Sequence, residues 1–263
     1  MSVAPRPGFF GKLPSHGDFV TRGLSRDFTE GWDQWLQHCV AASKATLGAE
    51  WTDIYLVSPI WRFVLSADVC GPSAWAGIVF PSVDRVGRYF PLTIAVATLP
   101  GALPLQIVTS SGAWFAAAEQ LAWEVLEEEG YDADRLEQAV AALGGIELGA
   151  ARLSFDAQPP AAGAENGVAV AIAAGATVGQ TVLVLAQQLI AATMRGGHSL
   201  WWTGGSEQVP PMLFVSPGLP DPGSYAGLLH FDHATDSAAV PVGFGLPDAE
   251  STPGAVDEGA EAE

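Results

Sequence analysis

Basic residues are scarce in this chain, and beyond residue 90 they are almost absent. The sequence contains 11 Lys and Arg against 29 Asp and Glu, which gives a net charge of −18. Residues 1–90 hold eight basic and eight acidic side chains, whereas residues 91–263 hold three basic and 21 acidic ones. A phosphate backbone would meet repulsion over two thirds of the chain, so nucleic acid and anionic membrane surfaces are poor partner candidates. An acidic partner is expected to dock on the neutral first third.

Cysteine is rare as well. The two that are present, Cys39 and Cys70, form no CxxC pair and stand at no metal-ligand spacing from a histidine. This pattern excludes a disulfide framework and gives no zinc signature. Both side chains are expected to be buried thiols.

The chain lacks an unbroken apolar run of membrane-spanning length. Residues 168–194 carry no charge, but glycine and glutamine interrupt them. We predict a strand at 168–173 and a buried helix from about 180 to 195 rather than a bilayer span. The first residues, MSVAPRPGFF, contain no apolar core of signal-peptide length, which predicts a cytoplasmic protein without membrane insertion.

Apolar spacing in the rest of the chain predicts an α/β fold of the α+β type, in which helices cover a mainly antiparallel central sheet. Helices are expected at 26–47 with Ser25 as N-cap, at about 112–129, over 136–143, and at 222–229. Runs at 60–66, 75–80 and 92–98 predict a three-stranded meander, and 199–203 and 212–215 predict two further strands. We expect one domain over residues 1–246 and an acidic disordered tail over 247–263.

Residues 8–19, GFFGKLPSHGDF, follow neither a helical nor a strand period and predict a shaped turn. Pro14 fixes its own φ and favours an extended conformation at Leu13. Three aromatic side chains are expected to pin the turn to the core: Phe9, Phe10 and Phe19. Three glycines can take positive φ at little steric cost, namely Gly8, Gly11 and Gly17.

Ser15, His16 and Asp18 are the residue types of a hydrolytic triad. A working triad holds the histidine between nucleophile and carboxylate, which neighbours on one tight turn rarely achieve. The preferred interpretation is that Ser15 and Asp18 hydrogen-bond to local backbone N–H groups and lock the turn.

No cofactor and no metal are predicted. The Gly11-Lys12 pair lacks both the earlier glycine and the following Ser or Thr of a phosphate loop. His230, Asp232 and His233 are metal-binding residue types. However, two histidines three positions apart on a strand point to opposite faces, and no third protein ligand can be named.

Residues 81–92, PSVDRVGRYFPL, predict a second shaped connection. Asp84 can pair with Arg85 or Arg88, and Gly87 allows a sharp turn, so these residues can simply close the connection between two strands. The alternative is that Arg85 and Arg88 present bidentate donors to acidic or phosphorylated groups of a partner.

Trp201 and Trp202 are adjacent in a predicted strand, so one side chain faces the core and the other faces the opposite side. Nine tryptophans in the chain favour a tryptophan-rich core. An outward tryptophan would instead favour a protein contact.

Five strings stand in a characteristic order: GFFGKLPSHGDFVTRGL at 8–24, WDQWLQ at 32–37, PIWRF at 59–63, PSVDRVGRYFPL at 81–92 and SLWWTGG at 199–205. In this order the chain resembles the type VI secretion-associated TagF (ImpM) proteins over roughly residues 8–230. The resemblance implies a cytoplasmic, non-enzymatic regulator. Such a protein would repress a bacterial type VI secretion system after translation by binding a scaffold protein with a forkhead-associated domain. A longin-like first half is also implied.

The candidate residues fall into two groups on this interpretation. Candidates for partner binding are the basic residues of the neutral third and one tryptophan: Lys12, Arg22, Arg85, Arg88 and Trp202. Candidates for a structural role in the turns are Gly11, Pro14, Ser15, Gly17, Asp18, Asp84 and Gly87. Two alternatives stay open: a small hydrolase or transferase that uses Ser15, His16 and Asp18, and a structural accessory subunit of the secretion apparatus.

Overall fold

A seven-stranded antiparallel sheet forms the centre of the molecule. A computed structural model describes residues 5–99, 102, 104–146 and 197–231, which all belong to one compact unit that ends at Phe231. The strands lie in the order β2-β1-β5-β4-β3-β6-β7. Their bounds are β1 Gly8–Lys12, β2 Phe19–Arg22, β3 Trp61–Leu65, β4 Trp75–Phe80, β5 Leu92–Ala97, β6 His198–Thr203 and β7 Met212–Pro217.

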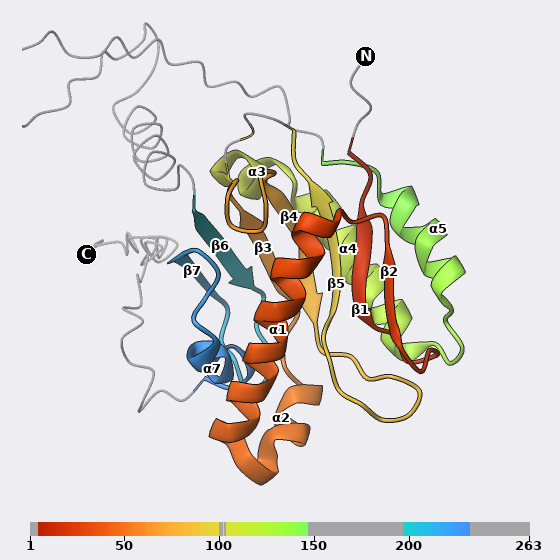
Figure 1. The fold of residues 1–263 in the computed structure, drawn as a ribbon, viewed down its shortest axis with the longest axis vertical. Helices are drawn as coiled ribbons and strands as arrows, with labels where there is room; N and C mark the ends of the chain where they lie inside the picture. Colours follow the sequence, from red (N-terminus) through yellow and green to blue (C-terminus); the bar gives the residue numbers. More distant parts are fainter. Residues whose placement is uncertain (1–4, 100–101, 103, 147–196, 232–263) are drawn as a thin grey trace, which may run out of the picture. The chain divides into compact units, whose positions relative to one another are not determined.

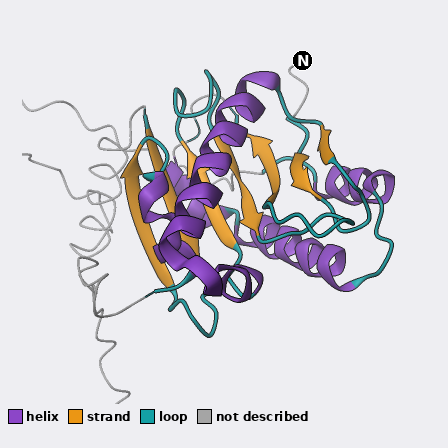
Figure 2. Cartoon of the chain, turned by 60° about the horizontal axis from the view of Figure 1, so that its bottom comes forward, coloured by secondary structure: helices purple, strands orange, loops and turns teal. Residues whose placement is uncertain are grey.

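Helices cover both faces of this sheet, so the predicted fold class is confirmed (Figures 1 and 2). Helix α1 crosses one face together with α2 and α7, and α4 and α5 lie on the other. The helical bounds are α1 Arg26–Leu47, α2 Trp51–Leu56, α3 Pro104–Ser110, α4 Gly112–Glu127, α5 Ala133–Leu143 and α7 Tyr225–Leu229, with 3₁₀ turns at Gly48–Glu50 and Pro222–Ser224.

The predicted meander is confirmed as β3, β4 and β5, which pair antiparallel with one another. These strands form nearly continuous apolar runs because both of their faces are covered. On β3, Phe63 packs on the α1 side and Val64 on the α4 side, and both are fully buried. The first five strands lie in the order β2-β1-β5-β4-β3, and the longin-like half that the resemblance implies stays a prediction.

Helix α1 begins where the sequence predicts. The Ser25 hydroxyl accepts a hydrogen bond from the Phe28 backbone N–H, which satisfies one of the donors that a helix start leaves open. The buried face of α1 carries Trp32, Trp35 and Cys39 at helical spacing. Trp32 stacks parallel to Trp201 of β6, so Trp201 is the inward member of the tryptophan pair.

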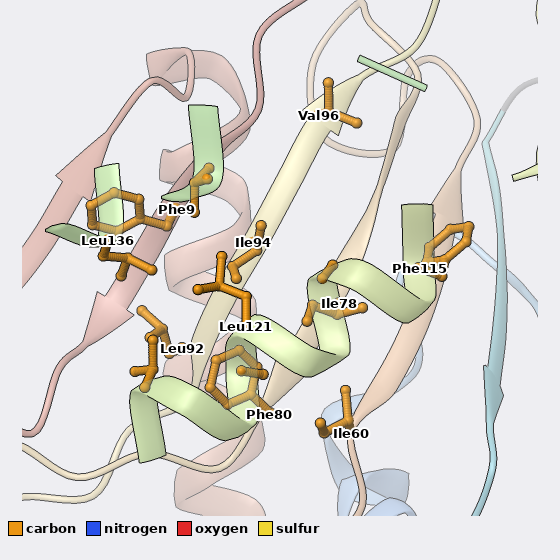
Figure 3. Packing of buried hydrophobic residues seen from close by; sticks show 14 of the residues in the cluster. Phe9, Ile60, Ile78, Phe80, Leu92, Ile94, Val96, Phe115, Leu121 and Leu136 are labelled. Carbon is orange, nitrogen blue, oxygen red and sulfur yellow. The ribbon is translucent and has the colours of Figure 1, made fainter. Parts of the chain in front are cut away.

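The opposite face of the sheet packs against α4 and α5 in a second hydrophobic core, which combines aliphatic side chains with phenylalanines (Figure 3). Leu92 and Ile94 of β5 and Ile78 of β4 point toward Leu121 of α4. Burial of such side chains is the main favourable contribution to folding, at about 1.5–3 kcal/mol for each. This layer holds β1 and β5 in place, and those two strands carry the site described below.

The prediction for residues 8–12 was wrong. Instead of forming a turn, Gly8–Lys12 is strand β1, which pairs with β2 on one side and with β5 on the other. All five residues are buried, so the strand shows no alternation of polar and apolar side chains. A Cβ atom on Gly11 would lie 2.1 Å from the Pro91 carbonyl oxygen, so this glycine serves close strand packing rather than a turn.

Some predicted features lie outside the described residues. These are the strand at 168–173, the helix at 180–195 and the acidic tail from residue 247.

Candidate partner-binding surface

Hydrogen bonds within the turn and to the helical layer hold the connection between β1 and β2 in place. His16 N–H donates to the Leu13 carbonyl at 2.9 Å, which closes a four-residue turn with Pro14 in its second position. The Ser15 hydroxyl donates to the Tyr131 carbonyl at 2.6 Å, just before α5. Ser15 therefore fixes the turn to the helical layer, and its partner lies 116 positions away in the sequence.

The connection between β4 and β5 is organised around one carboxylate. Oδ1 of Asp84 accepts the backbone N–H groups of Val86 and Arg88 at 3.0 and 2.9 Å. Gly87 N–H donates to the Asp84 carbonyl at 2.9 Å, and Gly87 has φ of 85°, a conformation that favours glycine. These bonds give the loop one defined shape.

The second oxygen of Asp84 joins this loop to the first strand. Oδ2 accepts the Lys12 ammonium at 2.6 Å and Arg88 Nε at 2.7 Å. Arg88 also donates to the Gly17 carbonyl in the β1–β2 turn. We call this group the Lys12–Asp84–Arg88 clasp; it joins the two long sequence strings that carry the family resemblance.

The clasp is buried at its centre. Lys12 is 5% exposed and Asp84 is 3% exposed. Burial alone would raise the pKa of the Asp84 carboxyl, but the hydrogen bonds from Lys12, Arg88 and the backbone outweigh it and hold that pKa well below its ordinary value. Asp84 therefore stays ionised at neutral pH and compensates the buried ammonium.

Further bonds align the two segments. Arg85 N–H donates to the His16 carbonyl at 2.9 Å, and the Ser82 hydroxyl donates to the Lys12 carbonyl at 2.8 Å. The fully buried Tyr55 supports Ser82 through its hydroxyl, which lies 3.0 Å from the Ser82 carbonyl. The β1–β2 turn and the β4–β5 loop thus form one rigid end of the sheet, visible at the lower right in Figure 1.

Four side chains project outward from this end, and we call them the loop-tip surface: Phe19, Arg85, Val86 and Arg88. Phe19 is 43% exposed and Val86 is 63% exposed. The Phe19 ring packs edge-on against Phe90 and lies 4.4 Å from Lys12 Nζ, a cation–π distance. The expectation that Phe19 is buried was wrong, because the strand after the turn lies at the edge of the sheet.

The candidate binding residues do not all gather at this surface. Lys12 is buried in the clasp, so it supports the surface without being available on it. Arg22 lies at the far end of β2 and pairs with Glu137 of α5 at 3.4 Å. Trp202 lies on β6, three strands beyond β5 in the sheet, and is half-buried with its ring edge-on to Phe115 of α4.

The triad residue types do not assemble into a triad. Ser15 Oγ lies 2.9 Å from His16 Nδ1, but a hydroxyl has one proton, and that proton goes to the Tyr131 carbonyl. His16 therefore donates to Ser15 instead of accepting from it. Asp18 accepts the neighbouring Phe19 N–H at 2.8 Å. The geometry fixes the turn and leaves the hydroxyl without a base.

The glycines of the turn were only partly predicted. Of Gly8, Gly11 and Gly17, only Gly11 has a positive φ, at 140°. A Cβ on Gly17 would meet only the Arg85 guanidinium, at an ordinary 3.6 Å. Gly17 contributes its carbonyl to Arg88 instead, which no local sequence pattern indicates.

Metal binding has no support in the described part of the chain. Within those residues, no three His, Cys, Asp or Glu side chains are grouped so that they could hold a metal ion. His230 is described, whereas Asp232 and His233 lie outside the described residues. Across the same residues, no helix is long and apolar enough to cross a membrane.

Comparison with known proteins identifies the family. The sequence model for the TagF N-terminal domain, described as type VI secretion system-associated, matches residues 8–143. The chain belongs to the TagF family. The matched range contains all three residues of the Lys12–Asp84–Arg88 clasp. TagF membership makes this a type VI secretion-associated protein.

A solved structure extends the likeness beyond that domain. The crystal structure of PA0076 from Pseudomonas aeruginosa PAO1 is 36% identical, with a TM-score of 0.69. The alignment covers 86% of this chain and 94% of that one. No curated protein matches the TagF sequence described here.

Proposed function

We propose that this TagF protein is a non-enzymatic, cytoplasmic regulator that represses a type VI secretion system after translation. It does so by binding a scaffold protein with a forkhead-associated domain, and the contact uses the neutral first third of the chain. Membership of the TagF family supports the link to secretion. The loop-tip surface supports a role in protein binding.

The proposal rests on which charged groups at the loop-tip surface already have a partner within the chain. Lys12 and Asp84 neutralise each other inside the clasp, and Arg88 donates to Asp84 and Gly17. Arg85 is exposed and forms no ion pair with a described residue, so its guanidinium is open to a carboxylate. An acidic partner is attracted there and is repelled by residues 91–263, which carry the whole net charge.

Ser15 and His16 support a non-enzymatic role. The Ser15 proton is directed to a backbone carbonyl, so the histidine beside it does not activate the hydroxyl. His16→Ala is expected to leave both stability and repression unchanged. Loss of repression in a stably folded His16→Ala variant would favour the hydrolase or transferase alternative.

The direct test is reversal of one charge. Arg85→Glu should weaken binding of the purified scaffold and release secretion in cells, while circular dichroism shows a native fold. Arg88 is unsuitable for this test, because Arg88→Glu would place a second carboxylate against Asp84 and break the clasp.

Arg6→Glu is the matched control. Arg6 is also exposed and lies just before β1, at the opposite end of that strand from Lys12. If Arg85→Glu binds the scaffold as tightly as the unaltered chain, the contact lies elsewhere and the proposed surface is wrong. Retention of this chain at fixed stoichiometry in assembled apparatus would favour the structural-subunit alternative.

A further inference from the structure

Val86 has an unusual position for an apolar side chain. It stands in the middle of a loop and, at 63%, has the largest exposed fraction among the large hydrophobic residues that the structure describes. Exposed loop positions usually carry polar or small residues, because an apolar side chain there gains nothing from folding. The structure gives no packing reason for a valine at this position.

The backbone around Val86 is held rigidly. Its N–H donates to Asp84 Oδ1 at 3.0 Å, and Gly87 N–H closes the turn on the Asp84 carbonyl. The Asp84 carboxylate is in turn fixed by the buried Lys12 ammonium at 2.6 Å. Because the backbone is already held, little backbone entropy is lost when a partner covers this side chain.

The charges beside Val86 indicate the chemistry of the partner. Arg85 and Arg88 lie close to it in the sequence. Arg88 pairs with Asp84, whereas Arg85 forms no ion pair with a described residue. Phosphorylated motifs are typically recognised by clusters of arginines, whereas a single guanidinium can pair bidentately with one carboxylate. Asp18, the nearby acidic residue of the turn, is held by the Phe19 N–H and would repel a partner carboxylate placed on its side.

We propose that Val86 is an anchor residue, which enters a shallow apolar pocket on the scaffold while Arg85 pairs with a carboxylate at the rim of that pocket. The inference rests on the proposed function and specifies the surface that the scaffold must offer. Phe19, which is also exposed at this end of the sheet, adds apolar surface. Central, well-packed anchors of this kind dominate binding energy in protein interfaces.

The test measures binding of the full-length chain to the purified scaffold by calorimetry. Val86→Thr keeps the branched shape but adds a hydroxyl, and burying that group without a partner should weaken binding by about tenfold. Val86→Ile should bind as the unaltered chain does. Val215→Thr is the matched control. Val215 is also exposed, but it lies on β7, an edge strand that is separated from β4 by β3 and β6.

Arg85→Gln provides the second arm. It should slow association and reduce its dependence on salt concentration, because a rim charge acts mainly on the rate of encounter. Thermal unfolding of each variant separates loss of binding from loss of fold.

Two failures are distinguishable. If the scaffold binds the unaltered chain and Val86→Thr equally tightly, the anchor inference is overturned while the proposed function stands. If the unaltered chain does not bind the scaffold at all, the proposed function fails and the inference falls with it. Weakening by Val86→Thr with no change in Val215→Thr supports both.

Discussion

The buried clasp predicts a specific pattern of stability in a double-mutant cycle. Asp84→Asn keeps an oxygen for the two backbone N–H groups but places an amide nitrogen against the Lys12 ammonium. Removing one partner of a buried ion pair costs about 3–5 kcal/mol, because the other charge stays buried without compensation. For a domain of this size, that cost lowers the unfolding midpoint by about 6–20 °C.

Lys12→Met should cost less than Asp84→Asn. In Lys12→Met the Asp84 carboxylate still accepts hydrogen bonds from Arg88 and from two backbone N–H groups. The free energy of unfolding should therefore fall by about the value of one charged hydrogen bond, about 1.5–3 kcal/mol. In the double variant the asparagine no longer faces an ammonium. The double variant should therefore be more stable than the sum of the single effects predicts, by about 1–3 kcal/mol.

Urea unfolding followed by tryptophan fluorescence measures these free energies. Glu30→Gln is the control, because it removes an ion pair with Arg26 in which both side chains are largely exposed, and it should leave the midpoint unchanged. The reasoning is refuted if Asp84→Asn costs less than about 1 kcal/mol, or if the single effects add within about 0.5 kcal/mol.

Three further outcomes are expected. Folding lowers the pKa of Asp84, so the ionised carboxylate stabilises the fold fully above about pH 4 and less as the pH falls further. The difference in the free energy of unfolding between the unaltered chain and Asp84→Asn should therefore become smaller between pH 4 and pH 2. Gly11→Ala should destabilise the fold by several kcal/mol in urea unfolding, since its Cβ would meet backbone, while Gly17→Ala should be close to neutral. Burial raises the pKa of both thiols, that of Cys70 to about 12. Cys39 and Cys70 should therefore react with a thiol reagent only after denaturant is added. Reaction of either cysteine in the native protein would show that its thiol is not buried.

The sequence predicted most elements of the described fold because their apolar periods were long. Helix α1 shows its N-cap and its apolar face within one continuous stretch, and β3 to β5 are separated by connections that contain glycine and proline. Strand β1 was missed because it is covered on both faces and uses glycine for close packing. Its five residues therefore show no alternation, and the two glycines and the lysine among them are residue types that are depleted in strands.

The site was only partly predictable for a related reason. Asp84 and Arg88 are four positions apart, so their pairing could be proposed from the sequence alone. The Lys12–Asp84 bond joins residues 72 positions apart and depends on β1 lying beside β5. One signal was available: a lone lysine inside a buried apolar string requires an anion nearby.

The pairing of β3 with β6 has a consequence for synthesis of the chain. Ser66 and His198 are hydrogen-bonded although 132 positions separate them, so β3 stays an open edge on the ribosome until β6 has been made. The family match ends at residue 143, before Trp201 can stack on Trp32. A nascent or shortened chain that stops there exposes a strand edge and lacks one wall of its aromatic core, which favours aggregation. The segment that matches the family model therefore lacks two strands of the sheet, β6 and β7.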